Sequence, residues 1–426
     1  MAPSPSSSTS LPSLLFTAAG VITGAALASI YYKTKAKTQQ ENNILPTREE
    51  PPTNKDRSQI IQNIGEYLCN TTNSANNNKV CVLGGGAFGT SLAYAAARNG
   101  YTVSIYCRDE AQAASINSSH INPRYLSDTI LPSSITATTE LKGAVLGCML
   151  IILALPCQKT PDFLRENRSI LPGGVVMCVT AKGLYLPTRQ LISDAIEDAL
   201  NNTNHDGGGE GQQQQKRKPN PLAFFSGPTF ASEIVKDNPT VAVVASQTLY
   251  HAVHVQKILS NETNFRLYVS QDIVSVQLGG ALKNPLAVGA GLLTGCGYGI
   301  NTLSAYVTRA TGELRQLCVA LGGEADTING LSGVGDLMLT CFSTQSRNQR
   351  CGVRLAHGES IEDILKDGMT VEGVATATVA VLYADACGLD MPLFRAVAGV
   401  IEGKLNCEEA LKRLFERPLG LEMKKK

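Results

Sequence analysis

Short apolar runs alternate with segments of helical composition through the first two thirds of the chain. Residues 80–83 form an apolar run that ends in glycines, and residues 88–100 have helical composition with a glycine at the end. Further runs that predict buried strands lie within residues 101–109, 144–156, 173–183, 221–231 and 240–246. Strands that alternate with helices predict an α/β fold with a doubly wound parallel sheet over residues 79–269.

The pattern changes after about residue 270. From there on, apolar residues recur at helical spacing, and strand signals are few. We therefore expect an all-helical second domain over residues 270–417, followed by a basic tail at 418–426. Because ligands often bind where two domains meet, we expect the functional site between the two domains.

The charges of the chain are almost balanced, with 37 Lys and Arg against 36 Asp and Glu. This balance argues against a nucleic-acid-binding protein, because such proteins carry a basic excess. The 12 cysteines include no C-x-x-C pair and no spacing typical of a metal site, so we expect no metal. Several of them, such as Cys81, Cys107 and Cys178, lie in apolar runs and are expected in the core, which favours a reducing compartment.

Residues 1–78 lie outside the predicted fold. Residues 11–32 are uncharged and long enough to span a bilayer, and a polar linker follows them. Lysines come after the apolar run, and positive flanks tend to stay cytosolic, so we expect an uncleaved anchor with the folded part of the chain on the cytosolic face. The alternative is a cleaved signal or organelle-targeting peptide, because Ala26-Leu27-Ala28 resembles a cleavage site.

A second polar stretch, residues 201–220, is of low complexity and is predicted to be a disordered surface insertion. It contains the glycosylation sequon Asn201-Asn202-Thr203. Asn201 should stay unmodified if the domain faces the cytosol.

The glycines that follow the first strand fit a dinucleotide-binding motif. Gly84, Gly86 and Gly89 have G-x-G-x-x-G spacing between a strand and a helix, as in a Rossmann-type fold. The pyrophosphate of a dinucleotide would meet the free N–H groups at the start of the helix. The alternative is an incidental glycine turn.

The second strand ends at Arg108-Asp109, about twenty residues further on, where such folds bind the ribose. Arg108 is placed to face a 2′-phosphate and Asp109 a 2′-hydroxyl. Alternatively, both side chains are simply solvated at a strand end.

Lys283 is the only charged residue between Asp272 and Arg309. An unpaired ammonium costs several kcal/mol to bury, so such a position needs a reason. Burial lowers the pKa of a lysine toward neutrality, which suits general acid/base catalysis. A second lysine, Lys182, ends the apolar run 173–183, where strand ends point into a ligand crevice. The alternatives are a Lys283 stem that reaches solvent along the surface, and a Lys182 on the surface.

Residues 330–352 combine glycines with polar side chains. Asp336 and Thr340 lie one helical turn apart, and Asp336 could neutralise a buried lysine. Arg347 offers a bidentate fork to a phosphate, and Asn348 adds a donor. Alternatively, Asp336 begins a helix as a cap and Arg347 is solvated.

The chain resembles the NAD(P)-dependent glycerol-3-phosphate dehydrogenases over about residues 79–417. The matching segments are GGGAFGTSLA, INPRYL, AKGL, GPTFASEI, GGALKNPLAVGAG, GLSGVGDLMLTC, SRNQRCG and VEGVATA. The resemblance implies a Rossmann-type domain followed by a helical domain. It also implies a homodimer that interconverts sn-glycerol 3-phosphate and dihydroxyacetone phosphate with NAD or NADP, and that feeds glycerol and glycerolipid synthesis.

The resemblance also implies roles for individual residues. Lys283 is the expected general acid/base, with Lys182, Asp336 and Thr340 beside it. The expected contacts of the phosphorylated substrate are Lys182, Asn284, Asp336, Ser346, Arg347 and Asn348. The expected cofactor contacts are Gly84, Gly86, Phe88, Gly89, Arg108, Lys182, Gly227, Thr229, Ala231, Arg347 and Glu372.

Two positions depart from the family pattern. Phe88 stands where many members have Trp, and Thr229 where Ser is common, but both keep the chemical type. The choice between NAD and NADP stays open. One rival hypothesis is a dehydrogenase of another small hydroxy or keto acid, against which Arg347 argues. Another is a non-catalytic nucleotide-sensing protein, against which the set of Lys283, Asp336 and Arg347 argues.

Overall fold

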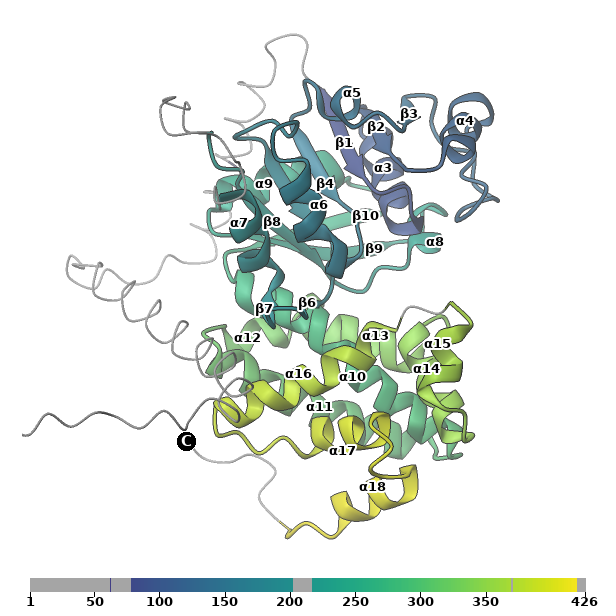
Figure 1. Cartoon of the computed structure of the whole chain (residues 1–426), viewed down its shortest axis with the longest axis vertical. Coiled ribbons are helices and arrows are strands. Elements are labelled where there is room, and N and C mark those ends of the chain that lie inside the picture. Colours follow the sequence, from purple (N-terminus) through teal and green to yellow (C-terminus); the bar gives the residue numbers. More distant parts are fainter. Residues whose placement is uncertain (1–61, 63–77, 202–216, 369–370, 420–426) are drawn as a thin grey trace, which may run out of the picture.

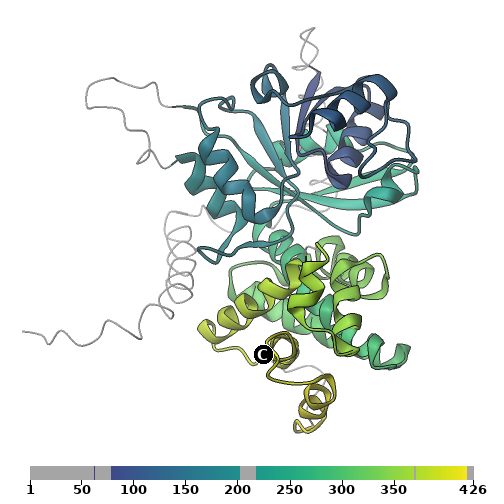
Figure 2. The same cartoon turned by 45° about the vertical axis from the view of Figure 1, so that its right-hand side comes forward.

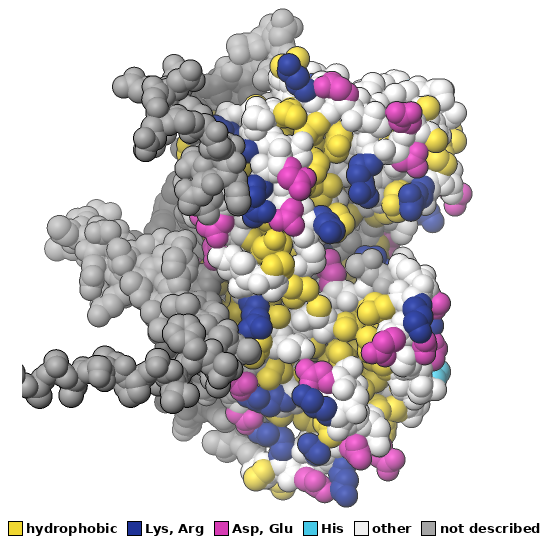
Figure 3. Space-filling view, in the orientation of Figure 1, with side chains coloured by type: hydrophobic (Ala, Val, Ile, Leu, Met, Phe, Trp, Pro, Cys, Tyr) yellow, Lys and Arg dark blue, Asp and Glu magenta, His cyan; other side chains and the backbone are white. Residues whose placement is uncertain are grey.

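A computed structural model describes residues 62, 78–201, 217–368 and 371–419 of the chain. These residues form an α/β domain with a helical domain stacked below it (Figure 1). The predicted fold class, a doubly wound sheet domain followed by a helical domain, is confirmed. The face shown in Figure 3 carries Lys and Arg side chains interspersed with Asp and Glu, as the balanced charge predicts.

The α/β domain is built on one eight-stranded sheet with strand order β10-β9-β8-β5-β4-β1-β2-β3. The strands are β1 Lys79–Leu83, β2 Thr102–Tyr106, β3 Ile135–Thr138, β4 Leu150–Leu153, β5 Val176–Val179, β8 Leu222–Ser226, β9 Thr240–Ser246 and β10 Phe265–Ser270. A separate two-stranded hairpin consists of β6 Leu184–Tyr185 and β7 Gln190–Leu191. The order reverses at β1, which pairs with β2 on one side and β4 on the other, so a ligand crevice is expected at the ends of these strands.

Helices cover both faces of the sheet. They are α3 Ala87–Arg98, α4 Glu110–Ser119, α5 Leu141–Val145, α6 Thr160–Glu166, α7 Ile192–Asn201, α8 Ala231–Ile234 and α9 Leu249–Leu259, with a 3₁₀ turn, η1, at Cys157–Lys159. Alternate residues of β1 belong to two different cores, Val80 to the one under α3 and Cys81 to the one under α6 and α7. The sheet is therefore buried on both sides, which explains why β4 and β5 are continuous apolar runs.

One strand pair departs from the predicted parallel sheet. β8 and β9 are antiparallel, while every other neighbouring pair in the eight-stranded sheet is parallel. The connection between them contains only the four-residue helix α8, whereas a crossover to a parallel strand usually contains a full helix. β3, β10 and the β6–β7 hairpin were not predicted from the apolar runs.

The helical domain surrounds one long central helix, α10 Ile273–Gly295 (Figure 2). The other helices are α11 Ile300–Ala320, α12 Ala325–Ile328, the π-helical turn η2 Leu331–Gly335, α13 Asp336–Phe342, α14 Arg347–Ala356, α15 Ile361–Lys366, α16 Glu372–Ala386, α17 Pro392–Ile401 and α18 Cys407–Phe415. α10 contacts α11, α13, α14, α16 and α17, and its first half also contacts β8 and β9.

Glycines allow α10 and α14 to touch backbone to backbone. A Cβ atom added to Gly291 of α10 would lie 2.0 Å from the carbonyl oxygen of Gln349, and one added to Gly352 of α14 would lie 2.0 Å from that of Val288. No side chain fits between helices this close. The glycines of this apolar stretch therefore bring α14, with Arg347 at its first position, against the helix that carries Lys283.

Several predictions fall outside the described residues. The predicted anchor at 11–32, most of the predicted linker and most of the predicted insertion at 201–220 lie in segments that the structure does not describe. The predicted basic tail is described only as far as Leu419. Among the helices that the structure does describe, none combines the length and the apolar composition needed to cross a bilayer.

Candidate active site

The glycine loop between β1 and α3 leaves the start of α3 open. Gly84 has φ +119°, and a Cβ atom there would lie 2.5 Å from the carbonyl oxygen of Ala154, which follows β4. At Gly86, by contrast, a Cβ atom would meet no atom within 4 Å. No side chain caps the first N–H groups of α3. The loop thus offers uncapped backbone donors on an open side, which suits the pyrophosphate of a dinucleotide.

A buried polar network holds this loop from behind. The carbonyl oxygen of Gly85 accepts hydrogen bonds from Gln112 Nε2 at 2.6 Å and from Asn122 Nδ2 at 3.0 Å. Asn122 also donates to the hydroxyl of Thr90 in α3 at 2.8 Å. All three side chains are buried. Asn122 belongs to the INPRYL segment, but its role in fixing the loop was not predicted, since it depends on contacts distant in sequence.

At the end of β2, the two residues that were candidates for ribose binding differ in their contacts. Asp109 is the N-cap of α4, and its Oδ1 accepts from the backbone N–H groups of Ala111 and Gln112 at 2.9 and 3.2 Å. Arg108 is exposed, and the preceding residue, Cys107, lies against Gly85 of the glycine loop. Its guanidinium has no hydrogen-bonding partner among the described residues. The local contacts therefore explain Asp109 as a helix cap and leave Arg108 available to a ligand.

The centre of the candidate site is one carboxylate shared by two lysines. Lys283 Nζ lies 2.5 Å from Asp336 Oδ1, and Lys182 Nζ lies 2.8 Å from Asp336 Oδ2. Thr340 accepts a further hydrogen bond from Lys283 at 2.8 Å, and the carbonyl oxygen of Gly227 accepts one from Lys182 at 2.8 Å. The predicted pairing of Asp336 with a buried lysine is confirmed, and a second lysine joins it.

Three separate parts of the chain position these groups. Lys182 follows β5 and Lys283 lies in the middle of α10, while Asp336 and Thr340 lie one turn apart on the same face of α13. Asp336 is fully buried and Lys283 is 7% exposed. Lys283 therefore does not reach solvent along the surface, because its ammonium ends on buried partners.

The electrostatics follow from this sharing. Burial raises the pKa of Asp336, but the adjacent ammonium groups of Lys182 and Lys283 outweigh it, so the pKa lies below its usual value. Burial lowers the pKa of Lys182 to about 8, with Asp336 acting in the opposite direction and Lys283 adding to the fall. At neutral pH the cluster therefore holds a carboxylate and a readily titrated ammonium at Lys182.

A chain of amides continues from the cluster to α16. Asn284 Nδ2 donates to the carbonyl oxygen of Lys182 at 3.1 Å and to Glu372 Oε2 at 3.2 Å. Asn348 Nδ2 donates to Asn284 Oδ1 at 3.0 Å, and its own Oδ1 accepts from Gly373 N at 2.9 Å. Burial raises the pKa of Glu372, which the positive charges nearby partly oppose. The predicted substrate contacts Asn284 and Asn348 are thus joined to the predicted cofactor contact Glu372.

Arg347 lies at the first position of α14, next to this amide chain. Its side chain is exposed and forms no ion pair within 4 Å with any described residue. Ser346, the N-cap of the same helix, is buried, and its hydroxyl accepts from Gln349 N at 3.2 Å. The guanidinium is therefore available to an anion, whereas the Ser346 hydroxyl already has a structural partner.

The cofactor loop and the lysine cluster meet at Phe88. Lys182 Nζ lies 6.0 Å from the centroid of the Phe88 ring, which packs on Phe225 at 5.6 Å. Thr229 Oγ1 donates to the carbonyl oxygen of Gly227 at 3.1 Å, the same oxygen that accepts from Lys182, and Ala231 begins α8 just beyond. Phe88 of the cofactor loop therefore lies beside Lys182, which is paired with Asp336 of the helical domain.

The chain is similar to one protein family over most of its described length. A model of the N-terminus of NAD-dependent glycerol-3-phosphate dehydrogenase matches residues 79–208, and a model of the C-terminus matches residues 272–412. Among curated proteins, glycerol-3-phosphate dehydrogenase (NAD(P)+) of Oleidesulfovibrio alaskensis is 36% identical over 342 residues, covering 80% of this chain and 99% of that protein. The protein of the same name from Brucella canis is 37% identical over 344 residues, covering 81% and 99%.

A solved structure has the same fold. Glycerol-3-phosphate dehydrogenase from Coxiella burnetii superposes with a TM-score of 0.71 at 27% identity, and the match covers 80% of this chain and 99% of that one.

Proposed function

The chain belongs to the NAD-dependent glycerol-3-phosphate dehydrogenase family, and from this premise we propose how its own residues carry out the reaction. It is an oxidoreductase that interconverts sn-glycerol 3-phosphate and dihydroxyacetone phosphate with NAD or NADP. When bound, the nicotinamide supplies or accepts the hydride. The protein must therefore bind the cofactor, hold the phosphorylated substrate, and move one proton at the oxygen of the reacting carbon.

The cofactor fits the glycine loop. The open side at Gly86 and the uncapped N–H groups of α3 suit a pyrophosphate, while close neighbours leave no room for a side chain at Gly84. Phe88 and Thr229 would border the nicotinamide half, because they adjoin the lysine cluster. Arg108 would lie on the ribose side and accept a 2′-phosphate.

Lys283 is the general acid in the reducing direction. Its ammonium donates a proton to the carbonyl oxygen of dihydroxyacetone phosphate, and the neutral amine takes a proton back in the oxidising direction. Asp336 and Thr340 hold Nζ in place through hydrogen bonds of 2.5 and 2.8 Å. Lys182 places a second positive charge beside the same carboxylate, where it stabilises negative charge developing on the oxygen.

Arg347 binds the substrate phosphate. It is exposed at the start of α14, close to the amide chain of Asn284 and Asn348, and its planar fork suits a phosphate dianion. Phosphate binding far from the reacting carbon would then position that carbon against Lys283. The observation that carries the proposal is the buried Asp336 carboxylate, which holds two lysines beside the open glycine loop.

The test is reduction of dihydroxyacetone phosphate by the purified chain, followed at the absorbance band of reduced nicotinamide with NADH and with NADPH. We expect rapid turnover with dihydroxyacetone phosphate and a much lower kcat/KM with dihydroxyacetone, which lacks the phosphate. A higher rate with a small keto acid would favour the rival dehydrogenase. Cofactor binding without turnover on any of these substrates would favour the nucleotide-sensing protein.

We also propose that the enzyme works as a homodimer and that its product feeds glycerol and glycerolipid synthesis. Both follow from the family resemblance. Sedimentation equilibrium at micromolar concentration would find twice the chain mass, and a monomer at that concentration would contradict the first proposal. Loss of the protein should lower glycerolipid labelling from dihydroxyacetone phosphate, and unchanged labelling would contradict the second.

For residues 11–32 we propose an uncleaved anchor that leaves the catalytic domain on the cytosolic face. Support comes from the sequence alone: an uncharged stretch of bilayer-spanning length, followed by lysines. The protein should pellet with membranes, and Asn201 should carry no glycan. A mass shift that an endoglycosidase removes and that Asn201→Gln abolishes would place the domain in a lumen. A chain shortened to about Ser29 would support the cleaved signal.

A further inference from the structure

Two cysteines at the edge of the helical domain lie outside the catalytic machinery. Cys296 directly follows the last turn of α10, and Cys407 is the first residue of α18. Of the eleven cysteines that the structure describes, eight are buried, and Cys296 alone is exposed. Cys407 is half-buried. Most thiols of the described chain are thus inaccessible, and the exceptions are this pair and the half-buried Cys387.

The two cysteines converge on one backbone carbonyl. The oxygen of Leu292, in the last turn of α10, accepts from the backbone N of Cys296 at 3.0 Å and from Cys407 Sγ at 3.7 Å. The Cys296 side chain also lies close enough to the Cys407 thiol to affect its pKa. Burial, followed by this contact, raises the pKa of the Cys407 thiol to about 12. Cys296 is therefore the sulfur that an external reagent reaches first, with Cys407 directly behind it.

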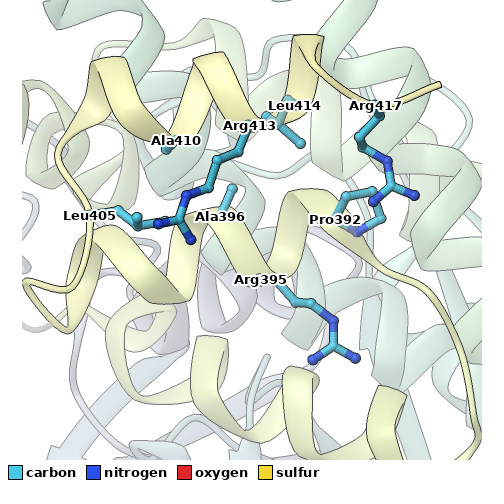
Figure 4. Close-up of a pocket in the computed structure, with 8 residues that line it drawn as sticks. All are labelled: Pro392, Arg395, Ala396, Leu405, Ala410, Arg413, Leu414 and Arg417. Atoms are coloured by element: carbon cyan, nitrogen blue, oxygen red, sulfur yellow. The ribbon is translucent and has the colours of Figure 1, made fainter. Parts of the chain in front are cut away.

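The helix that carries Cys407 packs on α17 and, through Leu411 and Leu414, against the core of the helical domain. α18 packs on α17 around a groove of about 190 Å³, visible in Figure 4. The groove is lined by Pro392, Arg395, Ala396, Leu405, Ala410, Arg413, Leu414 and Arg417. Ala410 is the only buried residue of α18, so this helix buries less apolar area than the central helices of the domain. A covalent bond from Cys407 to the end of α10 would add substantially to this contact.

We propose that Cys296 and Cys407 form a reversible disulfide that fastens α18 to the end of α10. The thiolate of Cys296 attacks one sulfur of a small disulfide oxidant, and one molecule of thiol leaves. The thiolate of Cys407 then attacks the sulfur of Cys296, and the second molecule of thiol leaves. The protein loses two protons and two electrons, and the oxidant disulfide is reduced to two thiols.

The bond should change stability and leave turnover unchanged. Lys283 lies about 20 Å from Cys296 along the axis of α10, so the reacting groups need not move. The closed loop spans more than 100 residues, which strongly restricts the unfolded chain. We expect the melting temperature of the oxidised protein to rise by about 5 °C or more.

The test equilibrates the full-length protein with oxidised glutathione, alkylates the remaining thiols and maps tryptic peptides. We expect a cross-link between the peptides 284–309 and 405–412, lost on treatment with dithiothreitol. In Cys407→Ser, the first step should still occur and the second should not, so Cys296 should keep a glutathione adduct. Cys387→Ser, a change at another half-buried cysteine, should still form the cross-link.

Three results would overturn the proposal. One is alkylation of both cysteines after equilibration, and another is a glutathione adduct on Cys296 of the unmutated protein without cross-linking. The third is a cross-linked protein whose melting temperature is unchanged. None of these measurements depends on activity, so their outcome is separate from that of the dehydrogenase assay.

Discussion

The glycine loop and the lysine cluster adjoin each other, but the loop offers backbone N–H groups to a ligand, whereas the cluster offers charged side chains. The loop uses backbone N–H groups at the open start of α3, and the buried residues behind it, Gln112 and Asn122, are neutral. The cluster concentrates two ammonium groups on the single buried carboxylate of Asp336. A backbone site loses little when one surface side chain changes. Loss of the shared carboxylate, by contrast, leaves two ammonium groups without their counter-charge.

The largest effect should come from removing that carboxylate. In Asp336→Asn the side chain keeps its shape, but two buried ammonium groups lose their counter-charge. We expect the free energy of unfolding to fall by about 3 kcal/mol and turnover to fall about a thousandfold, measured by chemical denaturation and by the reduction assay.

The matched control is the same change in the cofactor region, Asp109→Asn. Asp109 is exposed and caps α4, and asparagine caps a helix about as well, so stability should change by less than about 0.5 kcal/mol. Equal losses of stability in the two variants would contradict the contrast between the regions.

Next in size is the effect of the phosphate contact. Arg347→Leu should raise the KM for dihydroxyacetone phosphate by about 10- to 100-fold, because a charge-assisted bidentate contact is lost. The rate with dihydroxyacetone, already low, should change little. Arg350→Leu, at an exposed position of the same helix, is the control and should leave KM unchanged. Equal loss with both substrates in Arg347→Leu would show that Arg347 does not bind the phosphate; the cofactor KM should be measured alongside.

The pH dependence of kcat/KM should reflect the titration of Lys182 in the lysine cluster, because the backbone groups of the glycine loop do not titrate. Burial lowers the pKa of Lys182 to about 8, and the proposed role needs its ammonium form. Raising the pH above 8 removes that proton, so kcat/KM for the reduction should fall, approaching about tenfold per pH unit. The Lys182→Met variant should have a lower kcat/KM at every pH, and its kcat/KM should not begin to fall near pH 8. If kcat/KM of the variant still begins to fall near pH 8, a group other than Lys182 is responsible for the fall.

The smallest effect should come from the ribose side of the loop. Arg108→Ala should cut kcat/KM with NADPH about tenfold and with NADH by less than about threefold, because only NADPH carries the 2′-phosphate. Initial rates with the two cofactors give the comparison. A larger loss with NADH would mean that Asp109, despite its capping role, dominates the ribose pocket.

Sequence patterns predicted much of this fold because buried strands and amphipathic helices have different periods. They could not give the direction of β9, since a buried strand has the same apolar pattern whether it runs parallel or antiparallel to its neighbour. They also missed β3, a short strand of the sequence ITAT, and β10, an edge strand in which buried and exposed residues alternate at first.

The residues of the candidate site could be predicted from the sequence, but most of the hydrogen bonds and ion pairs between them could not. The isolation of Lys283 in an apolar stretch and the spacing of Asp336 and Thr340 are visible in the sequence. The bond between Lys182 and Asp336 joins positions 154 residues apart, and no local pattern encodes it. The same holds for Asn122, whose contact with Gly85 exists only once α4 and the glycine loop are packed together.

The most direct test of the proposed chemistry is the turnover of Lys283→Ala with saturating dihydroxyacetone phosphate, measured together with the dissociation constant of NADPH. Lys283 is the proposed proton donor and does not belong to the glycine loop. We therefore expect turnover to fall by at least about 100-fold while the dissociation constant of the cofactor changes by less than about threefold. Turnover close to that of the unmutated enzyme, in a variant that still unfolds cooperatively, would contradict the assignment of Lys283.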